Sequence, residues 1–103
     1  MLHELLNNVE ELINNKVILI TGGTGTFGHE ITKEILENYN PKKLIIFSRD
    51  EFKQYNMKKL FPESKYKNIR FFIGDVRDYE RLLTATKNVN LIFHAAAIKQ
   101  VDM

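Results

Sequence analysis

A glycine-rich loop between an apolar run and a helical stretch constrains the fold of this chain more than any other feature. The apolar residues Val17–Ile20 are followed at once by a G-x-G-x-x-G motif made of Gly23, Gly25 and Gly28, and apolar residues recur at helical spacing over 27–38. Glycine permits a tight turn, close approach of backbone to a ligand, and close packing of helix on strand. The loop therefore predicts a strand, turn and helix that can hold a pyrophosphate at the N-terminus of the helix.

The glycine spacing of the loop allows two other interpretations. Gly23 and Gly28 also have the spacing of a nucleoside-triphosphate loop, but His29 and Glu30 stand where that loop needs Lys and Ser or Thr. The triphosphate interpretation therefore fails. An ordinary glycine-rich turn between strand and helix remains the structural alternative.

The rest of the chain continues the alternation of short apolar runs and helical stretches. Further strands are predicted at 44–47, 69–73 and 91–95, separated by helices. Continuous apolar strands joined by helices indicate a parallel sheet covered on both faces, with right-handed crossovers. We therefore predict an α/β fold, the first half of a Rossmann-type doubly wound parallel sheet with strand order 3-2-1-4.

Local signals predict where the later helices begin and end. Ser48 and Glu51 form an S-x-x-E capping box, which predicts a helix running to about Phe61 before Pro62. Asp78 is the predicted N-cap of the next helix.

The N-terminal residues 1–15 form a separate pattern. Their apolar positions recur at threes and fours, which predicts an amphipathic helix that packs on a neighbouring element or another subunit. The polar face is acidic and amide-rich, which disfavours binding to a membrane surface. We expect residues 16–103 to be the N-terminal part of an NADP-binding Rossmann domain that is truncated here.

Composition excludes several classes of protein. The 103 residues hold 15 Lys and Arg against 13 Asp and Glu, a balance that gives no basic field for nucleic acid. The absence of cysteine excludes disulfides and thiolate metal sites, and we predict no metal. No apolar run approaches the roughly 20 residues of a membrane span, and the N-terminus lacks signal-peptide features. We therefore expect a cytoplasmic protein with no membrane span.

The end of the second predicted strand bears on the choice of dinucleotide. NAD-binding members of this architecture carry an acid about 20 residues beyond the motif, where this chain has Ser48 and Arg49. A hydroxyl and a guanidinium suit a 2′-phosphate, so NADP is favoured over NAD. Asp50 or Glu51 could still take the ribose-hydroxyl role if the strand ends later, and Arg49 could be a solvated surface cation.

Four segments together resemble a known family. Residues 21–28, 48–54, 72–78 and 94–101 are similar to the N-terminal part of extended short-chain dehydrogenase/reductases, of the UDP-N-acetylglucosamine 4,6-dehydratase type in polysaccharide biosynthesis. The glycine motif is shared by the whole superfamily. The second and fourth segments carry the specific part of the resemblance.

The motif and the resemblance together assign a cofactor site. Residues 24–27 would line the pyrophosphate, 48, 49 and 53 would surround the adenosine phosphate, 75 and 76 would hold the adenine, and 95–97 would pass along the cofactor. Lys99 would reach toward the nucleotide-sugar substrate. The full set of predicted cofactor residues is Gly22, Gly23, Thr24, Gly25, Thr26, Phe27, Gly28, Ser48, Arg49, Asp50, Lys53, Asp75, Val76, Ala95, Ala96 and Ala97.

Some of these residues also have plain structural interpretations. Asp75 could cap a turn after Gly74, and the alanines 95–97 could begin a helix. His94 lies inside a strand pattern and is better read as a structural histidine than as an acid or base.

No catalytic residue is assigned within the chain. The family uses a Tyr-x-x-x-Lys pair, and the two matches here, Tyr39 to Lys43 and Tyr55 to Lys59, fall on the wrong elements.

The resemblance implies that a longer parent protein is an NADP-dependent lyase acting on a nucleotide sugar, with UDP-N-acetylglucosamine as the expected substrate. These 103 residues alone would be inactive, and we expect homo-oligomers. Two alternatives stay open: an epimerase or reductase of the same superfamily, or a non-catalytic dinucleotide-binding module.

Overall fold

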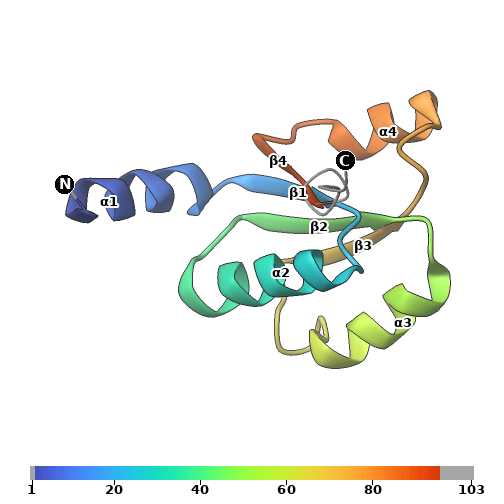
Figure 1. The fold of residues 1–103 in the computed structure, drawn as a ribbon, viewed down its shortest axis with the longest axis horizontal. Helices are drawn as coiled ribbons and strands as arrows, with labels where there is room; N and C mark the ends of the chain where they lie inside the picture. Colours follow the sequence, from blue (N-terminus) through green and yellow to red (C-terminus); the bar gives the residue numbers. More distant parts are fainter. Residues whose placement is uncertain (1, 96–103) are drawn as a thin grey trace, which may run out of the picture.

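Strands and helices alternate along the computed structural model, which describes residues 2–95 (Figure 1). The elements are α1 (Leu2–Ile13), β1 (Val17–Thr21), α2 (Thr26–Asn38), β2 (Lys43–Ser48), α3 (Glu51–Leu60), β3 (Ile69–Ile73), α4 (Tyr79–Thr86) and β4 (Leu91–His94). The strands form one parallel sheet in the order β3-β2-β1-β4. The predicted Rossmann-type sheet and its strand order are therefore confirmed.

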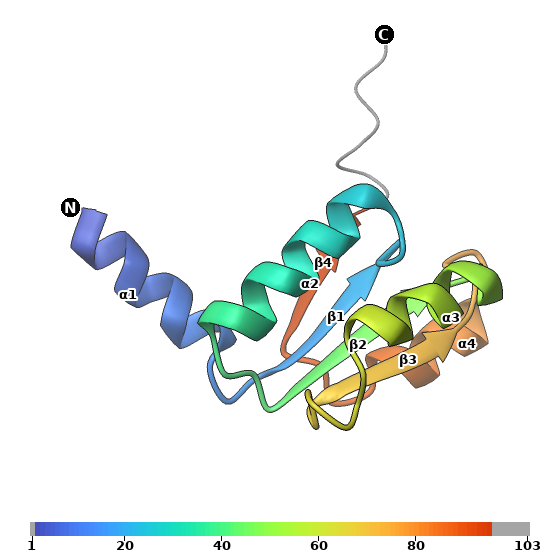
Figure 2. The ribbon, with the colours of Figure 1, turned by 90° about the horizontal axis from the view of Figure 1, so that it is seen from below.

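Helices cover both faces of the sheet, as the apolar strands require. Figures 1 and 2 show α2 and α3 on one face and α4 on the other. Ile18 and Ile20 of β1 are fully buried in the larger core, whereas Leu19 lies between them in sequence and belongs to the smaller core with Phe47. Alternate side chains of a strand point to opposite faces, so each face has its own apolar core.

The N-terminal helix extends away from the sheet and is attached at its C-terminal end (Figures 1 and 2). Ile13 is buried in the larger core, but Leu12 is 56% exposed. The Asn14 side chain accepts a hydrogen bond from the backbone of Asn40, and Asn15 donates to the same residue's carbonyl. The predicted helix is confirmed, while its packing on another subunit stays a prediction.

The predicted capping box at the start of α3 is wrong. β2 continues through Ser48, which pairs with Ile73 of β3, so Ser48 is still in the sheet. The N-cap is Asp50, whose carboxylate accepts a hydrogen bond from the Lys53 backbone at 3.0 Å. The predicted Asp78 cap of α4 is confirmed, because its carboxylate accepts from the backbone of Arg81.

The fourth strand is one residue shorter than predicted. β4 ends at His94, and Ala95 lies just beyond it as a buried residue of the larger core.

Candidate functional site

A cleft of about 900 Å³ lies where the strands end at their carboxyl edge. In parallel sheets of this type, ligands bind at that edge because loops from neighbouring strands meet there. The predicted cofactor residues that line the cleft are Gly22, Thr24, Gly25, Thr26, Phe27, Gly28, Ser48, Arg49, Asp50, Lys53, Asp75, Val76 and Ala95. Gly23 is not in the lining, and Ala96, Ala97 and Lys99 fall outside the described residues.

Close packing explains two of the loop glycines. A Cβ on Gly23 would lie 2.7 Å from a methyl group of Ile46, and a Cβ on Gly28 would meet the backbone of Gly23. The start of α2 therefore rests directly on the loop with no room for side chains. Gly22 adopts φ 65°, a conformation that favours glycine, and its N–H donates to the Phe47 carbonyl at 2.9 Å.

Gly25 is different, because the protein leaves space beside it. The nearest atom to a Cβ there would be the Gly22 carbonyl oxygen at 3.5 Å, an ordinary contact. Gly25 is the N-cap of α2 and, as a glycine, offers no side-chain hydrogen bond to the first N–H groups of the helix. The N–H groups of residues 26–28 begin the helix and so have no acceptor within it. This wall of the cleft presents backbone donors and the positive end of a helix dipole.

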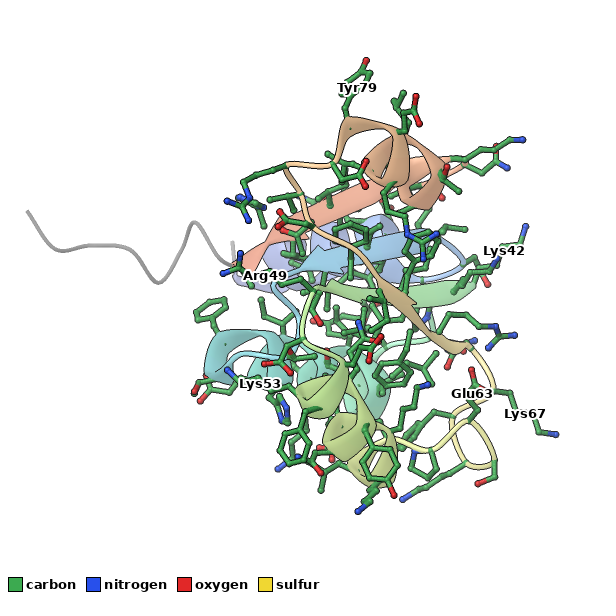
Figure 3. All side chains as sticks on the ribbon, turned by 90° about the vertical axis from the view of Figure 1, so that its right-hand side faces the viewer. Lys42, Arg49, Lys53, Glu63, Lys67 and Tyr79 are labelled. Atoms are coloured by element: carbon green, nitrogen blue, oxygen red, sulfur yellow. The ribbon has the colours of Figure 1, made fainter. Side chains whose placement is uncertain are left out.

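Basic side chains gather beyond the end of β2. Figure 3 shows Arg49 and Lys53 at the end of the molecule opposite Lys42. The Arg49 side chain is 72% exposed, and its Nη1 lies 3.6 Å from Oδ2 of Asp75. Arg49 is thus as exposed as a surface cation would be, and it also lines the cleft. The Asp50 carboxylate accepts from the Lys53 backbone, and the ion pairs between described side chains do not include it.

Asp75 is held by a residue that the sequence analysis did not assign. Its Oδ1 accepts from the backbone N–H of Arg77 at 2.9 Å, and its Oδ2 accepts from the Arg77 guanidinium at 2.7 Å. Those side-chain and backbone hydrogen bonds, with the charges of Arg77 and Arg49, hold the pKa of Asp75 well below its usual range. The turn-capping alternative for Asp75 is therefore observed, at a position that also lines the cleft.

Four lining residues were missed: Glu30, Phe47, Gly74 and Arg77. Only glycine fits at position 74 without a steric clash, since a Cβ there would lie 2.7 Å from the Phe47 ring. Arg77 had a weak local signal, because an Asp side chain commonly caps the backbone two residues ahead. Glu30 and Phe47 carried no signal in the sequence.

The remaining candidates lie as the sequence analysis predicts. His94 is in β4, and its Nδ1 is hydrogen-bonded to Thr21 Oγ1 on the neighbouring strand, which fits a structural role. Tyr39 is the C-cap of α2, and Tyr55 lies exposed on α3 beneath the ammonium of Lys59. Neither tyrosine lines the cleft.

Neither a metal-binding cluster nor a membrane-spanning helix is found in the described part of the chain. Among residues 8–95, whose side chains are described, no group of three or more His, Asp or Glu side chains is placed to hold a metal ion. None of the helices described there is long and apolar enough to cross a membrane.

Comparisons with known proteins agree with the motif resemblance. A UDP-N-acetylglucosamine 4,6-dehydratase (inverting) from Campylobacter jejuni is 54% identical over 92 residues, which cover 89% of this chain and 27% of that protein. A UDP-glucose 4-epimerase from Rickettsia bellii is 47% identical over 84% of this chain and 26% of its own length. The solved structure of Pen from Bacillus thuringiensis superposes with a TM-score of 0.72 at 40% identity, covering 80% of this chain and 24% of that one.

The extent of these matches sets what they establish. The chain spans about a quarter of the length of the curated relatives it matches. The family described as polysaccharide biosynthesis protein matches residues 18–103, which is most of the chain. That match includes the glycine loop and the segments 48–54 and 94–101 that carry the specific resemblance. This chain therefore belongs to the polysaccharide biosynthesis protein family.

Proposed function

We propose that the cleft binds NADP, in a protein that dehydrates UDP-N-acetylglucosamine as a 4,6-dehydratase. The observation that carries the proposal is the meeting, in one cleft, of the α2 N-terminus with Ser48, Arg49 and Lys53. The first feature suits a pyrophosphate and the second suits a further phosphate. The 54% identity to a dehydratase of that name supports the choice of reaction.

The described residues fit such a cofactor. The space beside Gly25 admits a pyrophosphate against the unpaired N–H groups of residues 26–28. Arg49 and Lys53 would take the 2′-phosphate, together with Ser48, which directly precedes Arg49 in sequence and lines the same cleft. Val76 is 39% exposed and offers an apolar surface to the adenine, beside the fixed carboxylate of Asp75.

The work of this part of the protein is binding and orientation. When bound, NADP supplies a hydride acceptor and donor, which a dehydratase uses and regenerates within one turnover. The residues described here fix the phosphates and adenine, and so set where the nicotinamide end reaches. The acid and base groups of the reaction would be supplied by other parts of the protein, as we assign no catalytic residue here. We further propose that the protein acts in the cytoplasm, and homo-oligomeric assembly stays a prediction.

Product analysis separates the proposed reaction from its nearest alternative. We expect the complete protein, incubated with UDP-N-acetylglucosamine, to yield a product that has lost one water, measured by mass spectrometry. An epimer of unchanged mass would favour the epimerase alternative, which the 47% identical relative keeps open. A protein that binds NADP but turns over no nucleotide sugar would favour the non-catalytic binding module and contradict the dehydratase proposal.

A further inference from the structure

Gln54 of α3 lies buried over the ends of the paired strands β2 and β3, next to Ser48 in the cleft wall. Gln54 is only 2% exposed and does not line the cleft. Its Nε2 lies 3.0 Å from Ser48 Oγ, 3.0 Å from the Phe72 carbonyl oxygen and 3.3 Å from the Ser48 carbonyl oxygen. One amide thus connects the last residue of β2 to β3.

The partners of Gln54 settle which end of the amide faces Ser48. The Phe72 and Ser48 carbonyl oxygens can only accept hydrogen bonds, so the amide atom beside them must be the NH₂ group. That group carries two protons, and the two 3.0 Å contacts use them on Phe72 O and Ser48 Oγ. The Ser48 carbonyl is already satisfied by the Gly74 N–H at 2.9 Å. Gln54 therefore presents a donor to the Ser48 hydroxyl.

This contact fixes the polarity of Ser48. Because Ser48 Oγ accepts from Gln54, its own proton is available to a different partner, and it donates no hydrogen bond within residues 8–95, whose side chains are described. Ser48 is 7% exposed and that residue lines the cleft. Water in the open cleft can accept that proton, and a ligand that displaces the water must offer an acceptor in its place or leave the hydroxyl unsatisfied.

We infer that Gln54 is a positioning residue, which holds the Ser48 hydroxyl as a donor to a phosphate oxygen of the bound dinucleotide. The inference rests on the proposed binding of NADP and adds a determinant of its selection over NAD. A phosphate oxygen accepts from Ser48 and from the cations at 49 and 53 without having to donate. A ribose hydroxyl is uncharged, so it gains much less than a phosphate oxygen from Arg49, Lys53 and the Ser48 donor.

Cofactor titration of variants tests the inference. In the complete protein, Gln54→Met keeps the length of the side chain but removes the donor. We expect NADP affinity to fall about tenfold, the size of a weakened hydrogen bond to a charged group, with NAD affinity unchanged within about twofold. In a Ser48→Ala background, the same change should cause no further loss of NADP affinity, because Gln54 acts through Ser48.

A matched control separates positioning from stability. Asn68 donates its side-chain amide to the Pro41 carbonyl at 3.0 Å, a comparable link outside the cleft. Asn68→Leu should lower thermal stability and leave the ratio of NADP to NAD affinity unchanged. If Gln54→Met does not fold, Gln54→Asn replaces it, since the shortened amide no longer reaches Ser48 and should give the same selective loss.

Three results are distinguishable. An equal loss of both cofactors in the Gln54 variant, or losses that add in the double variant, would overturn the positioning role while leaving NADP binding intact. A wild-type protein that binds neither cofactor would instead overturn the proposed function on which the inference rests.

Discussion

The two walls of the cleft are built on different physical principles. The wall formed by residues 22–28 is defined by closeness of backbone, since Gly23 and Gly28 leave no room for a Cβ. The opposite wall, residues 48–53 with Asp75 and Arg77, is defined by charge and hydrogen bonds, largely on exposed side chains. The first wall fixes the shape of the cleft, and under the proposed function the second wall would select the dinucleotide.

The largest effect should follow a side chain placed where the first wall has no space. Gly28→Ala puts a methyl group against the backbone of Gly23, which cannot rotate away as a side chain could. We expect a loss of about 3 kcal/mol of unfolding free energy, at the upper end for overpacking, measured by chemical denaturation. Stability close to that of the wild type would show that α2 is not seated tightly on the loop.

The matched change at Gly25 should separate binding from stability on the same wall. The protein leaves room for a methyl group there, so Gly25→Ala should cost less than about 1 kcal/mol of stability. The methyl group would keep a pyrophosphate away from the helix N-terminus, so NADP and NAD should both lose affinity to a similar extent. Cofactor titration with both nucleotides is the measurement, and undiminished binding would contradict the pyrophosphate assignment.

Changes on the second wall should alter selection and leave the fold intact. We expect Arg49→Met or Lys53→Met to lose roughly 1.5–3 kcal/mol of NADP binding, the range for hydrogen bonds to charged groups, with little effect on NAD. Lys42→Met is the control, because Lys42 is exposed at the other end of the molecule (Figure 3). Equal losses for both cofactors would remove the distinction between the two walls.

The smallest effect concerns the pH dependence that Asp75 gives to stability. Its pKa is lower in the folded protein than in the unfolded chain, so its ion pair stabilises the fold above the unfolded-state pKa of about 4 and is lost as pH falls. The stability difference between wild type and Asp75→Asn should therefore be constant near neutrality and shrink below about pH 4. Because the cluster is exposed, salt should reduce the difference, and a difference independent of both pH and salt would contradict the account.

The strands and most of the residues that line the two walls could be predicted from the sequence, because local patterns determine them. Apolar runs and loop signals gave the four strands in their order, and the residues at the strand ends were identified as cleft residues. The Ser48 capping box failed because a four-residue pattern cannot show that β2 still pairs with Ile73 of β3. Whether a polar residue belongs to a strand end or a helix start is decided by the neighbouring strand.

The interactions that organise the second wall are harder to predict because they join distant residues. Gln54 connects to the Phe72 carbonyl across 18 positions, and no periodicity or spacing reports such a contact. Gly74 is small because the Phe47 ring of another strand lies against it. The sequence thus indicated which loops meet, while the packing and hydrogen bonds between them required the structure.

Selection by the second wall is tested most directly by titrating the complete wild-type protein with NADP and NAD under identical conditions and following bound cofactor. The contacts at Ser48, Arg49 and Lys53 predict NADP binding at least about tenfold tighter than NAD, a difference of roughly 1.4 kcal/mol. Equal affinities, or tighter binding of NAD, would contradict the assignment of this wall to a 2′-phosphate.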